Sequence, residues 1–374
     1  MVIVMLKATI ILMKDLIFSP NRQNHRPTVR GEREMHSIML ARIAYLLPFI
    51  KIIRRIGVSV DHELYREKLP NMLDDQPDAY IPVIQAVSFL RRMEHKEGIE
   101  DLGFLASQEV SYANLRSDFI AVSRSAPTLY ARLQLFEKLV SRENTCCQVS
   151  MIADAGDIRM AVNLVNCPNL RGLHYSEWIQ IIILIEIVRK TAGTCWCPSE
   201  ITFRSHFTPC QQAFELFPNT RFLFGQKNTS IKVPMFLLCQ PPLDRPSYQR
   251  PVSPSTSMPQ RAIDFGLNFP DSLKLLLQAY LREDCLSIQL AAEIAGVSVR
   301  TLQRRLAQFG LCYSALLEQA RFESALELIR DTGIKLLDVA YALGYEDPSH
   351  FSRAFRRMTG MSPRKYRQKL HAGL

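Results

Sequence analysis

Two short runs of hydrogen-bond donors near the C-terminus of the chain could recognise an ordered array of acceptors. The first run consists of Arg300, Gln303 and Arg304, and the second of Ser349, Ser352 and Arg353. In both runs the spacing of three and four residues places the side chains on one face of a helix. Such donors can hydrogen-bond to base edges in the major groove of DNA, where arginine pairs with guanine and glutamine with adenine. The two runs therefore predict a contact with nucleic acid, provided that helices present them outward.

An internal near-repeat supplies such helices. Ala292 precedes Gly296 by four residues, and Ala340 precedes Gly344 by four residues, 48 positions further on. A small alanine lets a second helix cross closely, and a glycine adopts the left-handed conformation that ends a helix and opens a tight turn. Ser298 is then placed to cap the helix that follows the first glycine. The pattern predicts two helix-turn-helix units.

The helix after each glycine has an apolar inner face. The predicted inner residues are Leu302, Leu306, Phe351 and Phe355. A third helix, predicted over Tyr313–Arg330, would join the units, so that their second helices meet successive major-groove turns about 34 Å apart. One such unit is compatible with an ordinary helical bundle. Two units in register, each with Arg on its outer face, favour DNA binding.

The charge of the chain supports an anionic partner. Its 374 residues include 46 Lys and Arg against 36 Asp and Glu, a formal net charge of +10. Residues 272–374 contain 15 basic and 10 acidic side chains, and from Pro348 onward seven are basic and none is acidic. A solubilising tail is the alternative interpretation of this run. The balance favours nucleic acid or a membrane surface over an acidic protein.

Proline divides the chain into two folded parts. Six prolines lie within Gln240–Pro259, where they deny the backbone both helical and strand hydrogen bonds. We therefore expect a folded domain over residues 39–239, a Pro-rich linker over 240–268 that limits contacts between the halves, and an all-helical domain over 269–374. Residues 1–38 are predicted to be a disordered or non-native extension. Their apolar start is interrupted by charges, so no membrane span is predicted.

The N-terminal domain is predicted to mix helices and strands. The expected helices are Ala41–Ile56, Tyr80–Lys96, Leu115–Ser123, Leu129–Arg142 and Tyr175–Thr191, and the expected strands are Cys147–Ala153, Ile158–Leu164, Ser199–Phe203 and Arg221–Phe224. The fold class is thus α+β, with a mixed α/β N-terminal domain and an all-α C-terminal domain. No phosphate-binding loop, nucleophile elbow or zinc-protease motif occurs in the sequence, so no catalytic residue is predicted.

The cysteines of the N-terminal domain are not expected to hold a metal. Cys195, Cys197, His206 and Cys210 lie near one another in the sequence but lack the paired spacing of structural zinc sites. We interpret these cysteines as small buried hydrophobic residues. The odd total of nine cysteines suits reduced thiols in a cytoplasmic protein. No metal and no cofactor is expected.

The C-terminal motifs resemble the DNA-binding domain of the AraC/XylS family of transcriptional regulators. The resemblance covers residues 272–371 and rests on the segments 298–306, 340–345, 351–357 and 359–367. Glu346 departs from the family, in which a small polar residue often caps the second recognition helix, and Asp347 could take over that role. Arg321 also fits the family pattern and is expected to be structural.

The resemblance implies roles for individual residues. Contacts with base edges are implied for Arg300, Gln303, Arg304, Pro348, Ser349, Ser352 and Arg353. Contacts with phosphate are implied for Arg305, Arg357, Lys365 and Arg367, and these would make affinity salt-dependent without selecting a sequence. The implied partners are double-stranded promoter DNA, RNA polymerase, a small-molecule effector and a second copy of the chain, with no membrane.

The N-terminal half resembles, more weakly, the ligand-sensing half of an AraC subgroup named after arabinose binding. The matching segments are 198–206, 214–217, 220–224 and 231–238. Its helix-rich start is unlike a simple sugar pocket, so arabinose itself is not implied. We expect an effector pocket in the apolar interior that includes Trp178, Ile181–Ile183, Phe203 and Phe224. Three alternatives remain open: a dimerisation domain without a ligand, an architectural nucleoid-type protein, and an enzyme with an appended DNA-binding unit.

Overall fold

The computed structural model contains a mixed α/β N-terminal half and an all-helical C-terminal half, which confirms the predicted α+β class. It describes residues 37–71, 73–154, 156–165, 172–244, 268–282 and 286–371. The predicted extension lies outside the described residues as far as residue 36, and the predicted linker does so over residues 245–267.

A five-stranded sheet forms the centre of the N-terminal half. Its order is β3 (Cys147–Asp154), β4 (Asp157–Leu164), β7 (Thr229–Pro234), β5 (Glu200–Thr202) and β6 (Arg221–Leu223). All neighbours pair antiparallel except β5 and β6, which are parallel. Four of these strands lie where the alternation of the sequence predicts them. The central strand β7 was not predicted as a strand, because its alternating segment is short and ends at Pro234.

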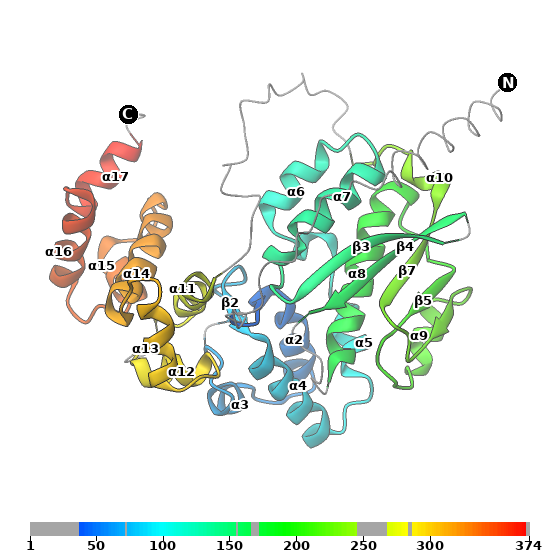
Figure 1. Cartoon of the computed structure of the whole chain (residues 1–374), viewed down its shortest axis with the longest axis horizontal. Helices are drawn as coiled ribbons and strands as arrows, with labels where there is room; N and C mark the ends of the chain where they lie inside the picture. The colour runs from blue at the N-terminus through cyan, green and yellow to red at the C-terminus, as the bar shows by residue number, and fades with distance from the viewer. Residues whose placement is uncertain are drawn as a thin grey trace. The chain divides into compact units, whose positions relative to one another are not determined.

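Helix α8 (Leu173–Ala192) lies against this sheet, as Figure 1 shows, and confirms the helix predicted over Tyr175–Thr191. Trp178 on α8 is fully buried, and its ring packs 4.8 Å from that of Phe203 and 5.0 Å from that of Phe104. Isoleucines on the other faces of α8 are also buried. Buried apolar residues therefore lie on several sides of the helix, as expected of a helix enclosed by packing.

Shorter helices surround this core. They are η1 (Ile43–Tyr45), α2 (Leu47–Arg55), α3 (Asp61–Arg66), α4 (Val83–Glu97), α5 (Leu102–Ser107), η2 (Tyr112–Asn114), α6 (Ser117–Arg124), α7 (Leu129–Leu139), η3 (Val140–Arg142), α9 (Gln211–Leu216) and α10 (Met235–Leu238).

A two-stranded ribbon replaces the start of two predicted helices. Strands β1 (Leu40–Arg42) and β2 (Tyr80–Pro82) pair antiparallel, with Ala41 opposite Ile81. The predictions of helix from Ala41 and from Tyr80 were therefore wrong at these ends. Strands of three residues are too short to display an alternating pattern, and all three residues of β2 are buried.

The C-terminal half is helical throughout its described part. Its helices are α11 (Phe269–Ala279), α12 (Ile288–Ile294), α13 (Val299–Ala307), α14 (Tyr313–Arg330), α15 (Leu336–Ala342), α16 (Pro348–Thr359) and α17 (Pro363–His371). Both predicted helix-turn-helix units are present, and the predicted joining helix has the bounds of α14.

The core of the helical half includes residues from the start of the chain. Ile38, Leu40 and Tyr80 are buried in the same cluster as Phe269 and the other apolar residues of α11. The Ile38 amide donates a hydrogen bond to Ser272 Oγ over 3.4 Å. The expectation that the linker limits contacts between the halves was wrong, because this ribbon packs directly on α11.

Candidate nucleic-acid interface and ligand cavity

The first helix-turn-helix unit has the geometry that its sequence predicts. Gly296 ends α12 with a left-handed φ of +67°. Ser298 then caps α13, because its side chain accepts a hydrogen bond from the Thr301 amide over 3.2 Å. Leu302 and Leu306 are 0% and 1% exposed. The three predicted base-contacting residues of this helix, Arg300, Gln303 and Arg304, are all exposed.

Removal of this cap tests its contribution. Ser298→Ala is expected to lower the free energy of unfolding by about 1 kcal/mol, because the amides at the start of α13 lose their acceptor. Ser298→Gly is expected to cost only a few tenths of a kcal/mol, because glycine leaves the first turn open to water. Urea unfolding of the full chain, followed by circular dichroism, measures both. Equal losses for the two variants would contradict a capping role.

The second unit is fixed by an arginine from the joining helix. Gly344 has a φ of +71°, and Arg321 donates from Nε to the Leu343 carbonyl over 3.1 Å and from Nη2 to the Gly344 carbonyl over 3.3 Å. Its guanidinium lies 4.9 Å from the centre of the Tyr345 ring. The structural role expected of Arg321 is confirmed, since it holds the turn between α15 and α16.

Asp347 caps α16, as expected from the departure at Glu346. Its side chain accepts a hydrogen bond from the Ser349 amide over 2.7 Å. This amide, together with the Ser349 hydroxyl, holds the pKa of Asp347 below its usual value. The helix buries its predicted inner residues, Phe351 and Phe355. Of its predicted base-contacting residues, Ser349, Ser352 and Arg353 are exposed, and Pro348 at the helix start is half-buried.

The four predicted phosphate contacts have different surroundings. Lys365 is exposed on α17. Arg357 is exposed and forms an ion pair with Glu318, whereas the guanidinium of Arg305 lies 4.9 Å from the centre of the Phe269 ring. Arg367 is half-buried, and it donates to the Ile329 carbonyl over 3.0 Å and to the Ile334 carbonyl over 2.8 Å. Arg367 therefore ties α17 to the end of α14.

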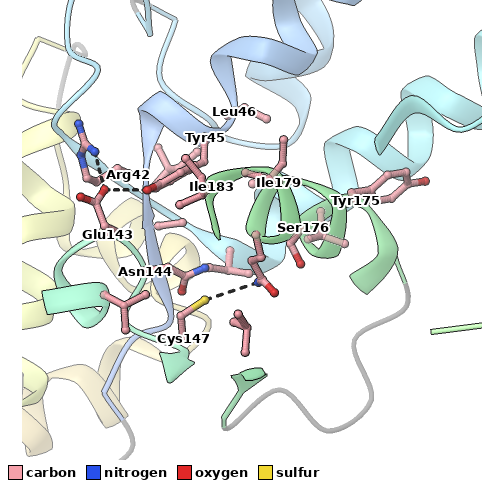
Figure 2. Close-up of a pocket in the computed structure, with 18 of the residues that line it drawn as sticks. Arg42, Tyr45, Leu46, Glu143, Asn144, Cys147, Tyr175, Ser176, Ile179 and Ile183 are labelled. Carbon is pink, nitrogen blue, oxygen red and sulfur yellow. Dashed lines mark hydrogen bonds and ion pairs between the residues drawn. The ribbon is translucent and has the colours of Figure 1, made fainter. Parts of the chain in front are cut away.

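A cavity of about 100 Å³ lies in the N-terminal half (Figure 2). Its walls come from the β1–β2 ribbon, α2, α4, the end of α7, strands β3 and β4, and one face of α8. Tyr175, Ile179 and Ile183 form the α8 wall. Of the residues predicted to surround an effector pocket, Ile183 lines this cavity, whereas Trp178 and Phe203 pack against each other elsewhere. The other residues predicted to surround an effector pocket do not line this cavity.

One end of the cavity is polar and contains a buried ion pair. Arg42 Nη1 lies 2.5 Å from Glu143 Oε2, and the same guanidinium also pairs with Asp78. Glu143 in addition accepts hydrogen bonds from the Tyr45 hydroxyl and the Arg116 amide, each over 2.9 Å. Burial, and after it the neighbouring Glu143 carboxylate, raises the pKa of Tyr45 well above its usual value. No motif predicts this network, because its members are far apart along the chain.

The helix-turn-helix units are similar to those of known transcriptional regulators. A sequence profile of a helix-turn-helix domain matches residues 291–369, which contain α13 to α16 and most of α17. An HTH-type transcriptional regulator of Mycobacterium tuberculosis is 30% identical over 160 residues, which are 41% of this chain and 45% of that protein. The HTH-type transcriptional activator RhaS of Enterobacter sp. is 36% identical over 113 residues, which are 29% of this chain and 41% of RhaS.

A further similarity extends across the N-terminal half. The HTH-type transcriptional regulator VirS of Mycobacterium tuberculosis is 22% identical over 330 residues, which are 88% of this chain and 96% of VirS. The matched segment, residues 291–369, is therefore a helix-turn-helix domain of the kind found in these transcriptional regulators. The alignments with the first two relatives span less than half of the length of those proteins.

The cysteines of the N-terminal half differ from expectation. Cys195 is exposed and Cys197 and Cys210 are half-buried, so the interpretation as small buried residues was wrong. Among the described residues, no group of three His, Cys, Asp or Glu side chains is placed to hold a metal ion.

Within the same residues, no helix is both long enough and apolar enough to cross a membrane.

Proposed function

We propose that this protein is a sequence-specific, DNA-binding transcription regulator that inserts α13 and α16 into two successive major-groove segments of promoter DNA. The observation that carries the proposal is the pair of capped helices, each with a buried apolar face and an exposed face of donors. Helix α14 has 18 residues, hence a length of about 27 Å, which suits units that bind neighbouring groove segments.

Base contacts are proposed for the exposed donors and for the start of α16. They are Arg300, Gln303, Arg304, Pro348, Ser349, Ser352 and Arg353. Phosphate contacts are proposed for Arg305, Arg357, Lys365 and Arg367. Lys365 serves best as the test residue of the second set, because Arg305, Arg357 and Arg367 also contact protein groups.

The proposal extends to the N-terminal half. There the apolar cavity binds a small-molecule effector and releases it unchanged, so the protein is not an enzyme. The protein acts as a homodimer in the cytoplasm and contacts RNA polymerase when it is bound to a promoter. The support for this part is the cavity itself, the weaker resemblance to a ligand-sensing subgroup, and the names of the relatives as transcriptional regulators.

Two substitutions separate the base-contacting role from the phosphate-contacting role. Arg304→Ala is expected to weaken binding to the specific site by about 1–3 kcal/mol and to relax the preference for one base pair. Lys365→Ala is expected to weaken specific and random duplexes alike and to reduce the salt slope by about one unit. Fluorescence anisotropy over a range of salt concentrations, with a site selected from genomic fragments, measures both effects.

Arg124→Ala is the matched control, because Arg124 is an exposed arginine on α6, outside the proposed interface. It is expected to leave both affinities unchanged. Equal losses on specific and random DNA for Arg304→Ala and Lys365→Ala would overturn the division of roles and would indicate an architectural DNA-binding protein.

A further inference from the structure

The β1–β2 ribbon has two faces with different neighbours. Ala41 and Ile81 are paired across the ribbon, and both line the cavity. Leu40 and Tyr80 alternate with them and are buried in the core that includes α11. Successive residues of a strand point to opposite faces. The ribbon is therefore at once a wall of the cavity and a part of the core of the DNA-binding half.

Polar contacts reinforce this connection next to the ribbon. Gln85 on α4 donates to the Ile294 carbonyl at the end of α12 over 2.9 Å. The Tyr280 hydroxyl, which follows α11, donates to the Lys68 carbonyl over 2.8 Å. Helix α12 and the turn that follows it position α13, so a shift of the ribbon and α4 bears directly on the first proposed recognition helix.

The cavity is too small to enclose a ring-sized ligand as it stands. Its volume is about 100 Å³, whereas a dry engineered cavity of about 150 Å³ accepts benzene. A ligand with more than a few heavy atoms can be enclosed only when a wall moves. Helix α8 is held by its packing on β7 and α5, whereas the ribbon consists of two strands of three residues. The ribbon is further bonded along β1, where the Arg42 amide donates to the Glu143 carbonyl over 3.1 Å and the Leu40 carbonyl accepts from the Thr145 amide over 2.9 Å.

The charges of the cavity indicate what kind of ligand it accepts. Arg42 and Glu143, the charged residues that line the cavity, are paired with each other, so the wall offers no excess charge to an ionic ligand. A donor is present instead at Gln180, whose Nε2 bonds the Cys147 sulfur over 3.5 Å (Figure 2). Sulfur is a weak acceptor, and an oxygen of a ligand can replace it. The remaining lining is almost entirely aliphatic and aromatic.

We propose that the cavity takes a neutral, largely apolar ligand with one hydrogen-bonding oxygen, and that its entry displaces the β1–β2 ribbon and thereby changes the DNA affinity of the helical half. The inference rests on the proposed function, because it names the class of the effector and the route by which it acts. A charged ligand would lose its hydration without gaining an opposite charge, which disfavours anions and cations alike. The ligand shifts DNA binding only by its different affinity for the two ribbon positions.

The experiment compares benzyl alcohol with benzoate, which have the same ring and differ in charge. Calorimetry and thermal melting of the full chain are expected to detect binding of benzyl alcohol and not of benzoate. With benzyl alcohol present, the Kd for the selected DNA site is expected to change about fivefold or more. Hydrogen exchange at α11 is expected to change in the same sample, whereas exchange in the sheet strands β5 and β6 is not.

Cavity filling provides the specificity control. Ala86 on α4 lines the cavity, and Ala86→Leu is expected to abolish binding of benzyl alcohol and its effect on DNA affinity. Ala121→Leu makes the same change at an exposed position of α6 and is expected to behave as wild type.

Two results would overturn the proposal. Equal binding of benzoate, or no binding of benzyl alcohol, would refute the class of ligand. Binding of benzyl alcohol that leaves both DNA affinity and exchange at α11 unchanged would refute transmission through the ribbon. DNA binding by the probe-free wild type tests the proposed function separately, so the failure of one proposal is distinguishable from that of the other.

Discussion

Glu143→Ala is expected to lower the free energy of unfolding by about 3–5 kcal/mol, because it leaves the buried Arg42 guanidinium facing a gap. The Arg42 and Glu143 side chains are 4% and 6% exposed, so water cannot replace the missing carboxylate. The substitution also removes the acceptor of the Tyr45 hydroxyl and of the Arg116 amide. Urea unfolding of the full chain, followed by circular dichroism and intrinsic fluorescence, measures the loss.

Two further variants make this result interpretable. Asp74→Ala breaks the exposed pair between Arg54 and Asp74 and is expected to change stability little, because water and salt screen such pairs. The double variant Arg42→Met with Glu143→Leu removes both charges and is expected to recover part of the stability lost by Glu143→Ala. A loss for Glu143→Ala no larger than that for Asp74→Ala would contradict the buried-pair interpretation.

Gly344→Ala is expected to destabilise the DNA-binding half by about 2–5 kcal/mol, because two costs add. At a φ of +71° any L side chain is strained, and a Cβ at this position would also overlap the Leu281 carbonyl oxygen. That oxygen belongs to the backbone and cannot rotate away as a side chain would. Thermal and urea unfolding give the stability change, and anisotropy with the selected site gives the accompanying loss of DNA affinity.

Gly296→Ala is the matched control for this substitution. Gly296 has a similar φ of +67° in the first unit, but a Cβ there would meet no atom within 4 Å. It is expected to cost only the strain of the left-handed backbone, about 1–2 kcal/mol. If the two variants were equally destabilised, the close approach of Leu281 to Gly344 would have no energetic consequence.

The helix-turn-helix units could be predicted from the sequence because their determinants are local. Gly296 and Ser298 set the end of one helix and the start of the next within three positions, and Gly344 and Asp347 do the same in the second unit. The 3.6-residue spacing of the inner apolar residues then identifies the outer face. Because the inner face is known, the positions of the donors on the outer face can be predicted from the same spacing.

The cavity and the ribbon could not be predicted, because their determinants are distant in sequence. Helix α8 has buried apolar residues on several sides, so its sequence does not distinguish the face with Ile179 and Ile183, which lines a cavity, from the face with Trp178, which packs solidly. Likewise, only the pairing of β1 with β2 brings Ala41 to Ile81. A cavity depends on how several elements that are distant in sequence pack together. The hydrophobic periodicity of one segment does not predict that packing.

The ribbon also has a consequence for the synthesis of the protein. Ile38 and Ser272, which hydrogen-bond in the finished structure, are 234 residues apart. At about 5–20 residues per second, a ribosome takes about 10–50 s to make the segment between them. During that interval the apolar side chains of Leu40 and Tyr80 have emerged without their partner α11. The nascent chain therefore exposes an aggregation-prone apolar surface until its last hundred residues are synthesised. A polypeptide truncated before α11 exposes this surface permanently.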